Sequence, residues 1–190
     1  MKKTPLIIFL ILTTLYILFG YGVMITNDSV TNVDQIVSLN IWSRSSHFTF
    51  HLLGVIFYLF FSKLLSLNAV TSIEILLAVV SATASVALYQ IVLKKFNNVS
   101  HAIITVIIYA IASGIFRFSS QVEYIVLVPS LAIMSLYFYS KDQFLIAGTI
   151  FGFGMLTSVL IVLFAPTFLL FTSFKELFKK QNIIFAVFSI

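Results

Sequence analysis

The sequence predicts an all-α integral membrane protein, a polytopic bundle of transmembrane helices with interfacial helices in its first external loop. Two observations predict this class. Hydrophobic residues make up 61% of the 190 residues and charged residues only 9%, whereas soluble domains carry about 25% charged residues. The apolar residues also gather into runs close to the length of about 20 residues that crosses a bilayer as a helix. We therefore expect a single transmembrane domain over residues 1–190, with an external loop over 25–71.

The charged residues and the lack of cysteine narrow the class of function. The net charge of +5 comes from Lys and Arg in short clusters between apolar runs, which is the pattern of the positive-inside rule and not that of a nucleic-acid surface. The absence of cysteine excludes disulfides, zinc-thiolate sites and thiol catalysis. We expect the lipid bilayer, and no nucleic acid, as a partner. Richness in Ile, Phe, Asn and Lys is typical of an AT-rich bacterial genome. We therefore expect a bacterial cytoplasmic membrane.

The N-terminus predicts an uncleaved first transmembrane helix. Lys2 and Lys3 precede residues 5–24, which carry no charge. A signal peptide is the alternative, but no A-x-A-like cleavage site follows, so we expect a helix with a cytoplasmic N-terminus. At the other end, the apolar run after Gln181 stops at about half the length that a bilayer needs. We expect the 190 residues to be the N-terminal piece of a longer protein.

The polar loop over residues 25–51 is the stretch most able to carry chemistry. It holds the only tryptophan and several ionisable residues, Asp28, Asp34, Arg44, His47 and His51. The segment from Thr31 to Asp34 resembles a capping box with Asp in place of Glu. Apolar residues follow at helical spacing, at Val33, Ile36, Val37 and Ile41. This pattern predicts a short amphipathic helix on the membrane surface, with Trp42 as its interfacial anchor.

Helices are also expected in the apolar segments after the loop. Residues 48–67 either span the membrane or lie in its outer interface. Residues 72–93 form a full-length helix whose small residues suit close helix packing in lipid. Residues 99–118 form the next helix, and residues 124–139 form another that carries Pro129, which membrane helices tolerate.

The last long apolar segment predicts a hairpin. Residues 144–171 are too long for one span and too short for two ordinary ones. They are interrupted near the middle by Gly148, Gly152, Gly154 and Thr157-Ser158. We therefore expect two short helices that fold back on each other.

Two arrangements distribute the basic residues differently. If 48–67 spans and 144–171 is one helix, the Lys94-Lys95 pair lies outside. If 48–67 lies in the outer interface and 144–171 is a hairpin, every lysine pair lies inside, and Glu74 and Glu123 join the acidic loop residues at or near the outer face. We prefer the second arrangement, because the lysine pairs are the strongest part of the positive-inside signal.

Several ionisable residues are candidates for chemistry. Asp28 and Asp34 flank the expected start of the amphipathic helix, where a carboxylate is stabilised as the anion and could act as a general base or a metal ligand, or could simply cap the helix. His47 and His51 are four residues apart, which suits contact with a phosphate headgroup better than a metal site. The loop RFSSQVE begins with Arg117 and ends with Glu123. The two residues could form a surface ion pair, or Arg117 could contact a phosphate while the Glu123 carboxylate faces a cavity. We expect Glu74 to be interfacial.

The order of these features resembles the N-terminal part of the GT-C superfamily. These polytopic glycosyltransferases use polyprenyl-phosphate sugars and include the protein O-mannosyltransferases and the lipid A aminoarabinose transferase. The resemblance rests on Asp28 or Asp34 after the first helix, on SSHFTFHLLGVIFYLF, on RFSSQVEYIVLVPSLAIMSLYFY and on the hairpin AGTIFGFGMLTSVLIVLFAPTFLLF. Asp28 is followed by Ser where the family often has a second acid, and the proline-rich stretch usual after the loop histidine is absent.

The resemblance implies inverting transfer of a hexose or pentose from a polyprenyl-phosphate carrier to an acceptor on the outer face. It implies that Asp28 deprotonates the acceptor hydroxyl and that Arg117, with His47 or His51, stabilises the leaving phosphate. Glu123 would bind the acceptor, or a divalent metal in those members that use one.

Two other functions stay open at this point. A non-catalytic assembly or export partner would not gather Asp28, Arg117 and Glu123 around one cavity. A transporter would bury charges near the bilayer midplane, whereas here they lie at helix ends. The sugar, the acceptor and the oligomeric state are not fixed by the sequence.

Overall fold

The structure is a computed structural model that describes residues 3–20, 26–42 and 47–170. The interpretations given for Lys2, Arg44 and the apolar run after Gln181 concern residues outside these ranges. Within them every element is helical. They follow in the order α1 (Thr4–Leu18), α2 (Asn27–Val37), α3 (Phe48–Leu65), α4 (Ala69–Phe96), α5 (Val99–Ile111), α6 (Ser113–Ser119), η2 (Tyr124–Val126), α7 (Leu127–Tyr139), α8 (Phe144–Met155) and η3 (Val159–Leu170).

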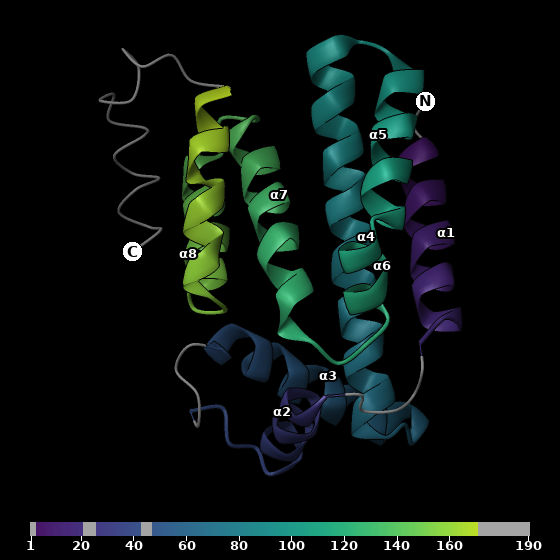
Figure 1. Ribbon diagram of the computed structural model, residues 1–190, viewed down its shortest axis with the longest axis vertical. Coiled ribbons are helices and arrows are strands. Elements are labelled where there is room, and N and C mark those ends of the chain that lie inside the picture. Colours follow the sequence, from purple (N-terminus) through teal and green to yellow (C-terminus); the bar gives the residue numbers. More distant parts are fainter. Residues whose placement is uncertain (1–2, 21–25, 43–46, 171–190) are drawn as a thin grey trace.

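The long helix α4 is the centre of a bundle. Helices α1, α5 and α7 pack directly against α4, and α8 packs against α7 (Figure 1). The small residues that predicted close packing are all buried, at Ser81, Ala82, Ala84, Ser85 and Ala87. Their lack of bulk lets neighbouring backbones approach, as in other membrane helices. Of the described helices, α3 and α4 are long and apolar enough to cross a bilayer.

Helices α2 and α3 form a layer across one end of the bundle (Figure 1). The buried face of α2, Val33 and Ile36, joins Phe50 of α3 in the main apolar core. Gly54 of α3 lies under Ile36, where a Cβ atom would come within 2.4 Å of the Ile36 Cδ1 atom. Much of the rest of α3 is apolar and exposed, including Phe60 and Leu64. Helix α3 runs across the end of the bundle (Figure 1), and whether it spans the membrane or lies in its interface stays a prediction.

The expected start of the amphipathic helix is wrong. Helix α2 begins at Asn27, four residues before the expected capping box, because the Thr26 side chain accepts a hydrogen bond from the Ser29 backbone N–H at 2.9 Å. Thr26 has the extended backbone typical of an N-cap residue. Asp34 consequently lies in the last turns of α2, and Ile41 lies beyond the helix end.

The expected helix over residues 99–118 is interrupted. Helix α5 ends at Ile111, Ala112 has ψ of 126°, and α6 begins at Ser113. The interruption coincides with a Ser-Gly pair, a combination at which helices commonly kink. The next expected helix starts as the 3-10 turn η2 and continues as α7, with Pro129 in its first turn.

The expected hairpin is confirmed. Helix α8 ends at Met155, residues 156–158 turn, and η3 returns along α8. The close approach depends on Gly154, where a Cβ atom would lie 2.0 Å from the Ile161 Cδ1 atom. The hairpin packs against α7 on the side away from α1 (Figure 1).

The two ends of the bundle differ in charge. The end of α4, with Lys94 and Lys95, lies beside the end of α7, and the Lys94 ammonium donates a hydrogen bond to the Ser140 carbonyl. Lys141 follows at the same end. The layer formed by α2 and α3 lies at the opposite end (Figure 1).

Candidate functional site

Glu123 meets the N-terminus of α2. Its Oε1 atom accepts hydrogen bonds from the Thr26 hydroxyl at 2.5 Å and from the Ser29 hydroxyl at 3.2 Å. The residue is only 5% exposed. Both donors belong to the first turn of α2, where the partial positive charge of the helix also favours a carboxylate. Residues almost 100 positions apart in the sequence thus share one polar contact.

Asp28 lies in the same turn of α2, between the two residues that bind Glu123. Unlike Glu123, it is exposed. The structure therefore brings Asp28 and Glu123 to the same turn of α2. The Asp28 carboxylate is exposed to solvent, and the Glu123 carboxylate is buried in the protein. Asp34 is also exposed but lies six residues further along α2, which is about 9 Å at the rise of an α-helix. The two aspartates do not share a site.

His47 lies at the start of α3 and connects this helix to two others. Its Nδ1 atom is 3.0 Å from the Thr157 carbonyl oxygen in the α8–η3 turn. Its ring stacks on Tyr124, with 3.8 Å between ring centroids. Because Tyr124 follows Glu123 directly, His47 is placed next to the segment that meets α2.

His51 is inside the molecule. It is fully buried, and its Nε2 atom is 3.1 Å from Asn32 Oδ1 of α2. An amide oxygen can only accept, so this bond places a proton on Nε2. The rings of His47 and His51 are 6.5 Å apart and have different partners. Among the described residues, no group of three or more His, Asp or Glu side chains is arranged to hold a metal ion.

Arg117 is exposed on α6. Its Nε–H donates to Gln121 Oε1 at 3.4 Å, and its guanidinium lies 5.8 Å from the Phe118 ring centre. Arg117 therefore contacts Gln121 and not Glu123. Most of its N–H groups stay open to a ligand, since a guanidinium carries five of them.

Glu74 is enclosed by the protein. It is 6% exposed, and its Oε2 atom lies against Gly20, just beyond the end of α1. Its place at the membrane interface stays a prediction. Sequence reasoning missed Asn32, Thr26 and Ser29. The spacing of Thr26 and Ser29 is an N-cap signal that the apolar pattern further along obscured. The pairing of Asn32 with His51 leaves no signal in the sequence.

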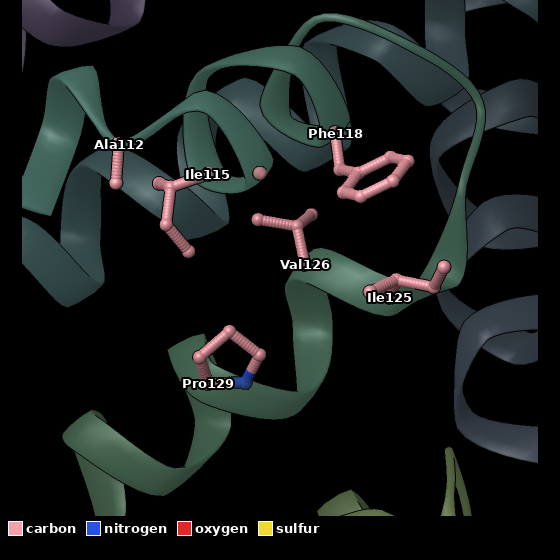
Figure 2. Close-up of a pocket in the computed structure, with 7 residues that line it drawn as sticks. Ala112, Ile115, Phe118, Ile125, Val126 and Pro129 are labelled. Atoms are coloured by element: carbon pink, nitrogen blue, oxygen red, sulfur yellow. The ribbon is translucent and has the colours of Figure 1, made fainter.

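An apolar hollow lies beside the segment that follows Glu123, and Ile125 and Val126 of that segment line it (Figure 2). It has a volume of about 230 Å³ and opens between α6 and the start of α7. Ile115, Val126 and Pro129 face it, and Ile125 and Phe118 border it. At Gly114 a Cβ atom would meet nothing within 4 Å. The hollow therefore has room for hydrocarbon beside a segment that carries Arg117 and Glu123.

Comparison with known proteins identifies a family. The family model described as dolichyl-phosphate-mannose-protein mannosyltransferase matches residues 51–190. No curated protein and no solved structure matches the chain. The matched stretch includes His51, Arg117 and Glu123 and begins after Asp28 and Asp34. It covers well over half of the chain and confirms the resemblance to polytopic GT-C glycosyltransferases. With this match and the all-helical, apolar fold, the chain belongs to the dolichyl-phosphate-mannose-protein mannosyltransferase family.

Proposed function

We propose that this chain carries the reactive end of a membrane glycosyltransferase, which moves a sugar from a polyprenyl-phosphate carrier to an acceptor at the outer face of the membrane. Membership of the family supports the reaction class. The observation that carries the proposal is the exposed Asp28 carboxylate in the turn of α2 that meets the buried Glu123. A non-catalytic partner has no need to bring these two acids together.

Asp28 is the general base in this proposal. Its carboxylate takes the proton of an acceptor hydroxyl while the hydroxyl oxygen attacks the anomeric carbon of the sugar. The bond from that carbon to the phosphate oxygen breaks, and polyprenyl phosphate leaves with the electron pair. The configuration at the anomeric carbon is inverted. An exposed carboxylate in the first helical turn suits the role, because a general base must come within hydrogen-bond distance of the hydroxyl proton that it removes.

Arg117 and His47 are the proposed contacts for the leaving phosphate. Arg117 is exposed and uses one N–H toward Gln121, so the rest of its guanidinium can bind phosphate oxygens in pairs. His47 is half-buried beside Tyr124, with its ring held by the stack. A guanidinium and a hydrogen-bond donor at this position would stabilise the charge that develops as the carrier leaves.

The apolar hollow in Figure 2 suits the isoprenoid chain of the carrier. Its lining is hydrocarbon, and it lies between Arg117 on α6 and the segment after Glu123. A carrier bound there would have its phosphate near Arg117 and its chain directed into the bilayer. Transfer of the chain from one apolar environment to another costs little, so the phosphate contact supplies most of the selectivity.

The proposed orientation in the membrane rests on where the lysines lie. The lysine-bearing ends of α4 and α7 lie opposite the layer of α2 and α3 (Figure 1). The positive-inside rule places the lysine end, and with it the N-terminus, in the cytoplasm. The acidic end then faces outward in a bacterial cytoplasmic membrane.

The test uses polyprenyl phosphate, the leaving group common to every sugar donor of this class. Tritiated undecaprenyl phosphate is titrated against the purified chain in nanodiscs. We expect Gly114→Phe, which fills the hollow, to weaken binding by about tenfold, a loss of about 1.4 kcal/mol. Thr14→Phe on α1, beside a separate shallow hollow, is the matched control and should leave binding unchanged. Equal binding by both variants would remove the hollow from the proposal.

A further inference from the structure

We infer that Glu123 is a positioning residue, which holds the first turn of α2, and with it Asp28, against the loop between α6 and α7. The role of Asp28 rests on the proposed function, whereas the attachment of α2 does not. The sequence expectation gave Glu123 a direct contact with acceptor or metal. Its surroundings favour a different role.

The Glu123 carboxylate is turned inward. It is 5% exposed, and one oxygen, Oε1, accepts both the Thr26 and the Ser29 hydroxyl. The Thr26 oxygen in turn accepts the Ser29 backbone N–H, which is the capping bond of α2. One buried oxygen thus connects the cap of the helix to a loop 97 residues further along the chain.

These bonds attach the N-terminal turn of α2 to the α6–α7 loop. Helix α2 packs on α3 and α4 through Val33 and Ile36, which lie toward its C-terminal half. Its N-terminal turn is bonded to the α6–α7 loop through Glu123. Because Asp28 lies in that turn, loss of the attachment would change the direction of the Asp28 carboxylate while the apolar packing of α2 stays in place.

Replacing Glu123 by Gln and by Ala distinguishes a positioning role from a direct role in catalysis. The side-chain oxygen of Gln can accept the same two hydroxyl hydrogen bonds as Glu. Glu123→Gln should therefore keep α2 in place, and Glu123→Ala should release it. A residue that binds a metal ion or moves a proton needs its charge, so Gln would then be as damaging as Ala.

The experiment measures the position of α2 without any substrate. The chain contains no cysteine, so spin labels at Val30→Cys and Lys141→Cys report the distance from α2 to the far end of the bundle by pulsed EPR in liposomes. Both positions are exposed. We expect one narrow distance distribution for the parent chain and for Glu123→Gln. Glu123→Ala and the double variant Thr26→Val/Ser29→Ala should at least double its width. Adding Glu123→Ala to the double variant should broaden it no further, because the double variant already removes the Glu123 contact, together with the capping bond of Thr26.

Two controls keep the result specific. Thr31→Val removes a hydroxyl that bonds within α2, to the Asn27 carbonyl, and should leave the distribution narrow. A second label pair on the exposed faces of α5 and α8, at Ile104 and Ile146, reports the bundle alone and should not change. If Glu123→Ala disturbs both pairs, the Thr26→Val/Ser29→Ala variant decides, since it should broaden only the first.

Two outcomes would overturn the inference. The first is a narrow distribution in the variants that remove the contact. The second is equal broadening by Gln and Ala. In a transfer assay, Glu123→Gln should keep kcat within about threefold of the parent, and Glu123→Ala should lower kcat with undecaprenyl phosphate binding unchanged. Failure of the Asp28 base would leave the EPR result standing, so the two proposals fail separately.

Discussion

At the scale of single residues, the two aspartates of α2 differ by the turn that they occupy. Asp28 lies in the first turn, beside the contact between Thr26 and Glu123, and Asp34 lies toward the other end. A general base must reach the proton that it removes, within hydrogen-bond distance. Only Asp28 belongs to the turn that meets the α6–α7 segment.

Asp28→Asn should therefore lower sugar transfer far more than Asp34→Asn. General bases contribute roughly 100-fold to 10,000-fold to rate, and we expect the Asp28 variant to be at least about 100-fold slower than the Asp34 variant. The measurement follows label from a tritiated mannosyl polyprenyl phosphate into acceptor in membranes that contain the full chain. Asp142→Asn, at the opposite end of the bundle, should match the parent. Equal loss in the two α2 variants would contradict the assignment of the base.

The buried pair of Asn32 and His51 belongs to the same scale but has a different function. Asn32 Oδ1 accepts from the His51 ring between two packed helices, and both residues are fully buried. Removing one partner of a buried hydrogen bond costs about 1–3 kcal/mol. The pair therefore supports the α2–α3 contact.

Asn32→Ala should lower the stability of the chain by about 1–3 kcal/mol, measured by thermal unfolding in detergent, while undecaprenyl phosphate binding by the folded fraction stays the same. Asn32→Asp retains an acceptor oxygen and should lose less. Loss of phosphate binding without loss of stability would instead assign His51 to the donor site.

At the scale of elements, the α8–η3 hairpin depends on close packing at its turn. Gly154 and Ile161 face each other across it. The hairpin also supplies carbonyl oxygens to the start of α3: Phe153 accepts from the Thr49 hydroxyl at 2.7 Å, and Thr157 contacts His47. The spacing between α8 and η3 therefore affects the layer that carries the site.

Gly154→Ala should destabilise the chain by about 1–3 kcal/mol, because the added methyl collides with Ile161 Cδ1. Ile161→Val lacks that atom, so the double variant should recover most of the loss. Circular dichroism during heating in detergent measures both. Gly114→Ala, where nothing lies within 4 Å, is the matched control and should cost nothing. A double variant no more stable than Gly154→Ala alone would show that the contact with Ile161 is not the cause.

At the scale of the whole molecule, three lysines lie together at one end of the bundle. Lys94, Lys95 and Lys141 lie at the end opposite α2 and α3. Cytoplasmic loops retain Lys and Arg because moving them across the membrane is disfavoured. The acidic layer should therefore be accessible from outside the cell.

Single cysteines test this orientation in intact cells, since the chain has none of its own. A membrane-impermeant maleimide should label Asn27→Cys and Val30→Cys on α2 directly. Ser100→Cys and Gln143→Cys, at the opposite end, should be labelled only after permeabilisation. All four positions are exposed. Direct labelling of Ser100→Cys together with protection of α2 would invert the orientation and place the proposed site inside the cell.

What the sequence could predict depended on whether the signal was local. The apolar runs and small residues of α4 are local and repeated, and they predicted membrane helices and close packing correctly. The glycines and Thr157-Ser158 predicted the hairpin. The break at Ala112 was not predicted, because glycine is frequent within membrane helices and Gly114 alone does not indicate an interruption.

The contacts of the candidate site are tertiary. Thr26 and Glu123 are 97 residues apart, and Asn32 and His51 meet only because α2 packs on α3. Their residue types are common at helix ends, so nothing in the sequence marks them as partners. The burial of Glu74 is tertiary as well, because the chain just beyond α1 covers the start of α4. The sequence identified the ionisable residues that are candidates for the site, but it did not predict which of them are buried in the protein.

The contacts between α3 and the hairpin also have a consequence for biosynthesis. His47 contacts a carbonyl 110 residues further along the chain. At a synthesis rate of about 5–20 residues per second, the ribosome needs roughly 5–20 s to deliver that partner. During this interval the start of α3 must be satisfied by water or by lipid headgroups, because its protein partners do not yet exist. The contact between α3 and the hairpin can thus form only after all the helices between them have been synthesised.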